Sequence, residues 1–300
     1  MNQLNQESRI QELRQRVRQE VEAGFFDRAI ALCDEAIRWA EGLDNPELRD
    51  LAICNRGGIL VVQGQGRSAV GELRKILLRS VNSANSCQAA YAISQYHELE
   101  GEGERSLFYA RLALDHAEKS EILEYIAKGH NRIANLLMLD SYFEDACVHY
   151  RQALDLLPHG HDLDQALLLS NSGYCRSVLG DFNLGLKQLF KSLDLIHHKC
   201  ALTWERFPCL GIAYAYLELD RLEQARVYAG RALRQSELSQ SSEQVKNSLY
   251  LLGEAAKLAG DEDVAYEYFG RLQTEFYPND AYISDFLMAT DIRKLINLMA

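Results

Sequence analysis

Histidine and cysteine side chains gather at two places in the sequence where they could bind a metal ion. The first is His159-Gly160-His161-Asp162, and the second is His197-His198-Lys199-Cys200 with Cys209 nearby. Imidazole and thiolate groups are suitable ligands for transition metals. Two such residues in a loop do not define a tetrahedral site, and histidines are common at helix ends because they interact favourably with the helix dipole. We therefore expect no metal and no other cofactor.

Motifs of catalytic sites do not occur in the sequence. A Gly-rich phosphate loop, an HExxH pair and a nucleophile elbow are all missing, which predicts that the protein is not an enzyme. The 32 basic and 43 acidic residues give a net charge of -11, which argues against nucleic acid and anionic membranes as partners. The residues from Met1 to Glu20 lack the apolar core of a signal peptide, so we expect a cytoplasmic protein.

A row of Asn, Gln and Tyr residues indicates binding rather than catalysis. An Asn or Gln amide can pair with both the N–H and the C=O of a peptide backbone, and Tyr adds a large, stiff contact surface with a polar tip. The alternative for a single Asn is a solvated or capping role, and for Tyr174 and Tyr214 it is core packing. The predicted partner-binding residues are Tyr91, Gln95, Lys128, Asn131, Arg132, Asn135, Asn171, Tyr174, Tyr214, Asn247 and Tyr250.

Small residues recur through the chain and predict the helices that must position this row. One set recurs every 37 to 40 residues, and an i, i+4, i+7 pattern of mostly small or apolar residues follows each member. Such a pattern lies on one face of an α-helix and lets a neighbouring helix approach closely. The set is Ala29, Ala69, Ser106, Ala146, Gly185, Ala225 and Ala265. A second set, twelve residues earlier, is Val17, Gly57, Ser94, Ala134, Gly173, Ala213 and Gly253.

Each repeat is therefore expected to hold two helices, with a short break between them. The breaks carry Gly, Asp or Asn, which end one helix with a left-handed cap and start the next. A pair of helices about 40 residues long cannot bury its own apolar face, whereas a stack of pairs can. We expect one all-α domain over 1–300, with repeats at 8–45, 46–84, 85–121, 122–160, 161–200, 201–240 and 241–280.

These offsets resemble the tetratricopeptide repeat, whose consensus has a Leu-Gly or Leu-Ala pair on the first helix and Ala, aromatic and Ala positions on the second. The matching residues include Ile133-Ala134, Leu252-Gly253, Ala146, Tyr150, Ala153 and Pro158. The resemblance covers roughly residues 8 to 277 and is to the lengthened, bacterial-type variant of about 40 residues. It implies a right-handed superhelical solenoid of about seven hairpins, in which the first helices line a concave groove.

Some tetratricopeptide domains clamp a C-terminal carboxylate, and part of that pattern is present. Lys128 and Arg132 match the final Lys and Arg of the clamp, but Cys54, Gly58 and Ala92 stand where its Lys and two Asn residues would be. We therefore do not expect a carboxylate clamp. Lys128 and Arg132 could still attract an acidic segment.

The segment 281–300 repeats the spacing of a first helix without a second helix after it. Its apolar residues fit one side of a helix, and we expect a helix that caps the stack. The alternative is that the apolar stripe is exposed and docks a second copy of the chain as a homodimer.

The resemblance and the polar row together imply a non-catalytic scaffold or adaptor that binds an extended peptide or protein segment in its groove. The alternative is a peptide-responsive regulatory subunit, similar to bacterial regulators with long repeats. Because the repeats begin near residue 8, such a regulator would act through a separate effector enzyme or transcription factor.

Overall fold

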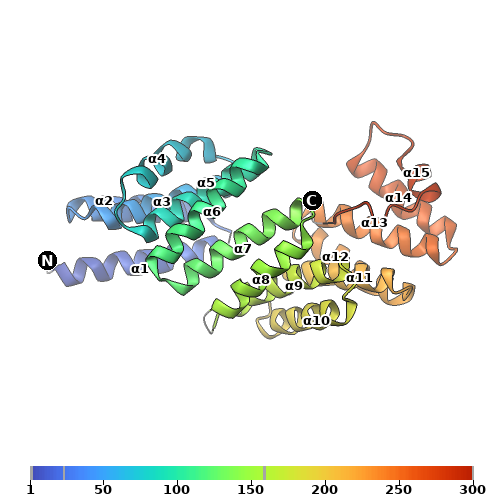
Figure 1. The fold of residues 1–300 in the computed structure, drawn as a ribbon. Helices are drawn as coiled ribbons and strands as arrows, with labels where there is room; N and C mark the ends of the chain where they lie inside the picture. The colour runs from blue at the N-terminus through green and yellow to red at the C-terminus, as the bar shows by residue number, and fades with distance from the viewer. Residues whose placement is uncertain (1–2, 23, 158–159, 299–300) are drawn as a thin grey trace. The chain divides into compact units, whose positions relative to one another are not determined.

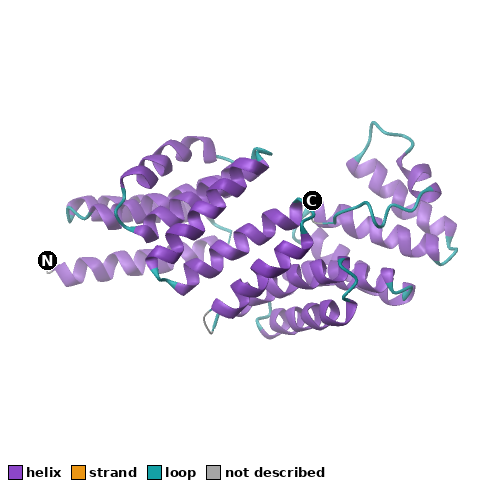
Figure 2. Ribbon diagram, in the orientation of Figure 1, coloured by secondary structure: helices purple, strands orange, loops and turns teal. Residues whose placement is uncertain are grey.

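The computed structural model describes residues 3–22, 24–157 and 160–298, and every regular element in these ranges is a helix (Figures 1 and 2). The helices up to the middle of the chain are α1 (Gln3–Glu22), α2 (Phe26–Gly42), α3 (Pro46–Val62), α4 (Gly66–Arg79), α5 (Ser83–Leu99), α6 (Gly103–Ser120) and α7 (Leu123–Leu139). The later helices are α8 (Phe143–Leu156), α9 (Asp162–Val178), α10 (Phe182–His198), the 3-10 helix η1 (Leu202–Glu205), α11 (Arg206–Glu218), α12 (Leu222–Leu238), α13 (Ser242–Leu258), α14 (Glu262–Phe276) and α15 (Ile283–Ala289). The all-helical repeat fold is confirmed.

The two predicted sets of small residues lie where helices contact one another, and all fourteen residues are buried. Gly173 shows why small size matters at these positions. A Cβ atom added there would lie 2.7 Å from Cγ of Leu189 and 2.9 Å from the carbonyl oxygen of Gly185. Contacts this short leave no room for a side chain, so glycine lets α9 and α10 pack at close range.

The helix ends follow the predicted break chemistry. Gly180, between α9 and α10, has a φ of 82°, a left-handed conformation that glycine adopts without strain. Its N–H donates to the carbonyl of Ser177 at 3.0 Å, which satisfies one of the carbonyls left free at the end of α9. The carboxylate of Asp181 then accepts from the N–H of Leu184 at 3.3 Å and caps α10.

The chain divides into two compact units, which are described separately here. Unit 1 is Met1–Leu136 and unit 2 is Leu137–Ala300, so the border falls inside α7. In unit 1, α3 packs against α5, and in unit 2, α9 packs against α11 and α11 against α13. Because these first helices of successive hairpins lie next to one another, we call the side of each unit that they form its inner surface.

The predicted capping helix over 281–300 is wrong for most of its length. Among the described residues 281–298 only Ile283–Ala289 is helical, and residues 290–298, the tail, continue as irregular chain. Lys257 Nζ donates to the carbonyl of Leu287 at 2.8 Å and to that of Thr290 at 3.0 Å, so these carbonyls bond a side chain instead of a next helical turn. Asp291 accepts from the N–H of Arg293 at 3.0 Å and fixes a non-helical bend.

Six of the seven cysteines are buried as free thiols, and Cys200 is exposed. Over the residues that the structure describes, no helix has both the length and the apolar character needed to cross a lipid bilayer.

Candidate functional site

The inner surface of unit 2 holds the tail of the same chain. In Figure 2 the tail is the loop that runs from the α15 end of the unit to the point marked C. It meets residues of α9, α11 and α13, the three first helices of unit 2. We call the surface that these helices offer to the tail the unit 2 groove.

Two predicted site residues bind the backbone of the tail at Leu298. The N–H of Leu298 donates to the hydroxyl of Tyr174 at 3.0 Å, and Nδ2 of Asn247 donates to the carbonyl of Leu298 at 2.5 Å. Tyr174, Asn247 and Leu298 are all at most 4% exposed. Contacts of this kind bind the backbone of the bound residue and do not depend on its side chain.

The neighbouring Asn297 ties the tail to the end of α7. Its Nδ2 donates to the carbonyls of Met138 at 2.8 Å and Leu139 at 3.3 Å, and lies 3.1 Å from the hydroxyl of Ser141. Carbonyls in the last turn of a helix have no partner within the helix. The side chain of Asn297 therefore acts as a cap that is supplied from a distant part of the sequence.

Aromatic rings pack against one another at Tyr174, the residue that binds the N–H of Leu298. The rings of Tyr174 and Tyr214 lie edge to face with centroids 5.5 Å apart, and Phe143 lies 6.2 Å from Tyr174 in a similar orientation. Both tyrosines are buried, and burial raises the pKa of Tyr214 to about 12. Their phenols therefore stay protonated and act as hydrogen-bond donors or acceptors at neutral pH.

Acidic residues lie further along the groove, at Glu218 and Glu254. Arg293 of the tail lies 3.8 Å from Glu218 and 4.0 Å from Glu254, and its shortest ion pair is with Asp291 at 2.6 Å. Glu254 is fully buried, and burial raises the pKa of its carboxyl group although Lys257, 2.8 Å away, acts in the opposite direction. This part of the groove suits a cation.

A cavity of about 310 Å³ remains beside the tail. Its lining is Lys246, Asn247, Tyr250, Leu272, Tyr277, Ile283, Phe286, Leu287, Ile292, Ile296 and Asn297. Tyr250 is another predicted site residue, and its hydroxyl is buried with no hydrogen-bond partner among the described residues. The tail therefore fills the groove incompletely.

Unit 1 has its own groove on the inner surface, with a volume of about 360 Å³. Residues of α1, α3, α5 and α7 and of the turns before α3, α5 and α7 line it: Gln11, Arg14, Asn45, Glu47, Leu48, Leu51, Asn82, Ala84, Asn85, Ile122 and Tyr125. The groove is polar along one wall and apolar at Leu48, Leu51 and Ile122.

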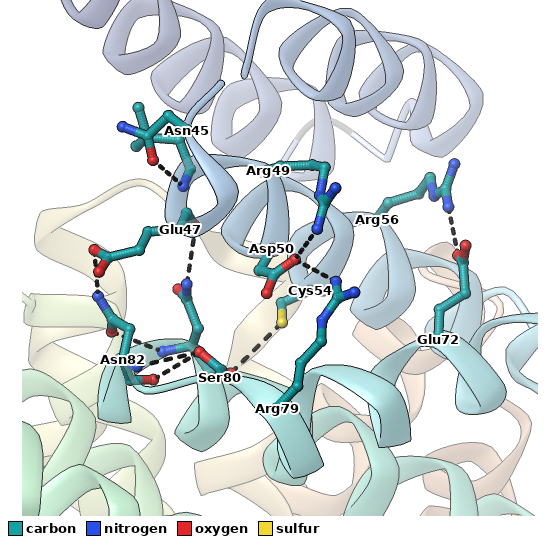
Figure 3. A network of polar contacts seen from close by, with 12 residues as sticks. Asn45, Glu47, Arg49, Asp50, Cys54, Arg56, Glu72, Arg79, Ser80 and Asn82 are labelled. Carbon is teal, nitrogen blue, oxygen red and sulfur yellow. Dashed lines mark hydrogen bonds and ion pairs between the residues drawn. The ribbon is translucent and has the colours of Figure 1, made fainter. Parts of the chain in front are cut away.

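The polar wall of this groove is a structural network (Figure 3). Asn45 caps α3 by accepting from the N–H of Leu48 at 3.1 Å, and Asn82 caps α5 by accepting from the N–H of Ala84 at 3.0 Å. Asn82 also donates to Glu47 at 3.0 Å, which joins the second hairpin to the third. The asparagines here serve as caps and links.

In the same view, the buried Asp50 pairs with Arg79 at 2.7 Å (Figure 3). Arg56 pairs with Glu72 at 2.6 Å and with Asp34 at 2.8 Å. These ion pairs connect successive helices of unit 1.

The predicted site residues of unit 1 have different surroundings. Tyr91, Gln95, Asn131 and Asn135 are half-buried on α5 and α7. Lys128 is exposed and pairs with Glu124 on its own helix at 2.6 Å. Their role in binding a partner stays a prediction.

Arg132, in contrast, is 4% exposed, and its guanidinium group bonds to other residues of unit 1. It donates to the hydroxyls of Ser94 at 2.9 Å and Ser106 at 3.2 Å, and pairs with Glu98 at 2.5 Å. It connects α7 to the preceding hairpin and does not face a ligand in this structure.

The last predicted residue, Asn171, is half-buried on α9 and hydrogen-bonds the buried hydroxyl of Tyr150. The structure thus brings Tyr174, Tyr214, Asn247 and Tyr250 together around the tail, and places Asn171 in a contact between helices.

One histidine of each cluster lies next to a carboxylate of a neighbouring residue. His197 lies 2.5 Å from Glu205 and His161 lies 3.0 Å from Asp164, whereas His159 falls outside the described residues. Within the described part of the chain, no group of three or more His, Cys, Asp or Glu side chains could hold a metal ion.

Sequence analysis missed the residues that the tail itself contributes. Asn297, Arg293 and Glu218 are not among the predicted partner-binding residues. One signal was available: Glu254 lies on the first helix of its hairpin, where a carboxylate is unusual beside the amides and phenols of the predicted binding residues. That signal indicated a cationic partner for the groove.

Comparison with known proteins identifies the fold of the chain. No protein-family model matches the chain, and no curated protein matches it in sequence. The apo form of RapI has a TM-score of 0.62 at 14% identity, over 96% of this chain and 85% of that one. PilF of Pseudomonas aeruginosa has a TM-score of 0.58 at 20% identity, over 80% of this chain and 97% of that one.

A Rap protein in complex with competence and sporulation factor is also similar, with a TM-score of 0.56 at 14% identity over 97% of both chains. At these identities the likeness concerns the fold. The chain has the helical-repeat fold of tetratricopeptide-type proteins.

Proposed function

We infer that the protein is a non-catalytic interaction scaffold that binds a segment of a partner protein or peptide on its inner surfaces. One observation carries this inference: Tyr174 and Asn247 hold the N–H and the C=O of Leu298, as a receptor holds the backbone of a bound peptide. Because these contacts do not depend on the side chain of residue 298, the same groups can bind a segment from another chain.

The surroundings of these contacts support the proposal. A peptide site needs buried aromatic surface and a few directed polar groups. The unit 2 groove offers both, with Tyr174 and Tyr214 as the surface and Asn247 and Tyr250 as the polar groups. One of the similar structures is a Rap protein bound to competence and sporulation factor, which shows this fold with a bound ligand.

The test is photo-crosslinking from single positions in the full chain. A photoreactive amino acid replaces Lys246, beside the cavity of the unit 2 groove, or Lys128, on the inner surface of unit 1. The matched controls are Lys191 on α10 and Arg111 on α6, which are exposed positions on second helices. We expect one partner to be crosslinked from an inner position and from neither control.

A partner crosslinked only from the control positions would move the interaction to the second helices and refute the proposal. Equal crosslinking from all four positions would indicate non-specific adhesion and would count against it as well. Mass spectrometry of the crosslinked peptide identifies the partner and the segment that is bound.

A further inference from the structure

The tail is hydrogen-bonded at both ends, to Lys257 at Thr290 and to the groove at Asn297 and Leu298, and is held more loosely between them. Asn297 and Leu298 make directed hydrogen bonds to the groove and to the end of α7. Ahead of them, Ile292 and Ile296 border the cavity of about 310 Å³. This space is open to the surface, so a different segment has room to make apolar contacts here that the tail does not make.

Three polar side chains of the groove, Tyr250, Glu218 and Glu254, make weak polar contacts with the tail or none. The buried hydroxyl of Tyr250 has no hydrogen-bond partner among the described residues, and buried polar groups are normally paired. Glu218 and Glu254 lie at the outer limit of ion-pair distance from Arg293, which is bonded more closely to Asp291. A different segment could satisfy these groups better.

We propose that the tail is an internal ligand of the unit 2 groove, and that the groove takes a partner segment in which an arginine precedes an aliphatic-Asn-aliphatic sequence, by displacing the tail. The arginine of the partner takes the place of Arg293 beside Glu218 and Glu254. Its asparagine takes the place of Asn297, and its last aliphatic residue that of Leu298.

This inference rests on the proposed function and adds to it the chemistry of the partner and a competitor built into the chain. A tethered segment competes at an effective concentration of roughly millimolar. If the tail occupies the groove for about 90% of the time or more, the apparent affinity for a free segment falls by about tenfold or more.

The experiment measures the binding of a fluorescent peptide with the sequence of residues 289–298 to the full chain by anisotropy. The native chain is compared with a tail variant that carries Asn297→Asp and Leu298→Asp. These changes place carboxylates against the carbonyls of Met138 and Leu139 and in the buried position of Leu298, which releases the tail. Circular dichroism and thermal melting check that the variant is folded.

We expect the tail variant to bind the peptide at least about tenfold more tightly than the native chain. Adding Asn247→Asp to the variant places an oxygen against the carbonyl that Asn247 binds, and should weaken binding by about tenfold. A peptide of the same composition in scrambled order should not bind. Equal affinity of native chain and variant, or no binding to either, would overturn the proposal.

Hydrogen exchange supplies a measurement that needs no variant. Excess unlabelled peptide is added to a native chain labelled with ¹⁵N, so that the mass separates the tail from the added peptide. Faster exchange of amides 290–298 on addition of the peptide supports displacement, and unchanged exchange at saturating peptide contradicts it. Crosslinking from Lys128, in unit 1, tests the scaffold function without the tail, so the two proposals can fail separately.

Discussion

Two tyrosines of the unit 2 groove form a natural pair for testing how the tail is held. Tyr174 accepts a hydrogen bond from the N–H of Leu298 at 3.0 Å, whereas the buried hydroxyl of Tyr250 has no partner among the described residues. The hydroxyl of Tyr174 also donates to Oδ1 of Asn297 at 3.4 Å. The same Tyr→Phe substitution therefore removes two hydrogen bonds to the tail at one position and an unsatisfied group at the other. The two variants differ from the native chain by one oxygen atom each.

The magnitude follows from what each change leaves behind. Without the hydroxyl of Tyr174, the N–H of Leu298 is buried without a partner, which costs about 1–3 kcal/mol. The tail can detach to avoid this cost, so we expect its opening to become about 5 to 150 times more frequent, since 1.4 kcal/mol is a factor of ten. At Tyr250 the substitution should be neutral or slightly stabilising.

The assay is amide hydrogen exchange of residues 290–298, together with urea unfolding of both variants. Tyr174→Phe should accelerate exchange of the tail amides, and Tyr250→Phe should not. If Tyr174→Phe left the exchange rates unchanged, or if both variants accelerated exchange equally, the hydrogen bond to Leu298 would not be what holds the tail.

Three further outcomes follow from the packing and the charges. Gly173→Ala should lower the free energy of unfolding by about 1–3 kcal/mol because the added Cβ has no space. Gly230→Ala should raise it by up to about 1 kcal/mol, because Gly230 lies inside α12 with open space around it. Urea unfolding measures both variants, and equal effects would contradict the packing argument. Burial raises the folded-state pKa of Glu254 above its ordinary 4.5, so the folded state binds the proton more tightly and the contribution of this group to stability is lost as pH rises from 4.5 through the raised pKa. Glu254→Gln should remove that slope from a series of urea titrations between pH 4 and 8, and an unchanged slope would assign it to other groups. Arg132→Met should lower the free energy of unfolding by about 1.5–3 kcal/mol, since hydrogen bonds to a charged group are lost. Lys128→Met should change the free energy of unfolding by no more than about 0.5 kcal/mol, because Lys128 is exposed. Similar losses in both variants would contradict the burial of Arg132.

The hairpins could be predicted because their signal is local. A small residue such as Ala146 or Gly185 marks the point where two helices touch, and a glycine such as Gly180 marks the end of a helix. Both effects depend on residues only a few positions away, so periodicity in one sequence reveals them.

The role of Arg132 could not be predicted in the same way. Its partners Ser94 and Glu98 lie 38 and 34 positions earlier, and only the packed hairpins bring them together. From the sequence, an arginine on a first helix looks the same whether it faces a ligand or a carboxylate of the preceding hairpin.

The tail was predicted wrongly for a related reason. Residues 281–300 have the spacing of an amphipathic helix, but the groove offers Tyr174, Asn247 and Lys257 as partners for their backbone. Tertiary hydrogen bonds override a weak local preference, particularly where burial of Leu298 adds to them. The border between the two units, inside α7, gives no sequence signal either, because the helix continues across it.

The contact between Asn297 and the end of α7 also sets an order in time. The two groups are separated by 159 positions in the chain, so the ribosome must add residues 139 to 297 before the bond can form. At the usual 5–20 residues per second, this takes roughly 8 to 30 seconds after Met138 is added. During that interval the helices of unit 2 emerge while their groove is still empty, which gives a chaperone or a partner made nearby the first access to it.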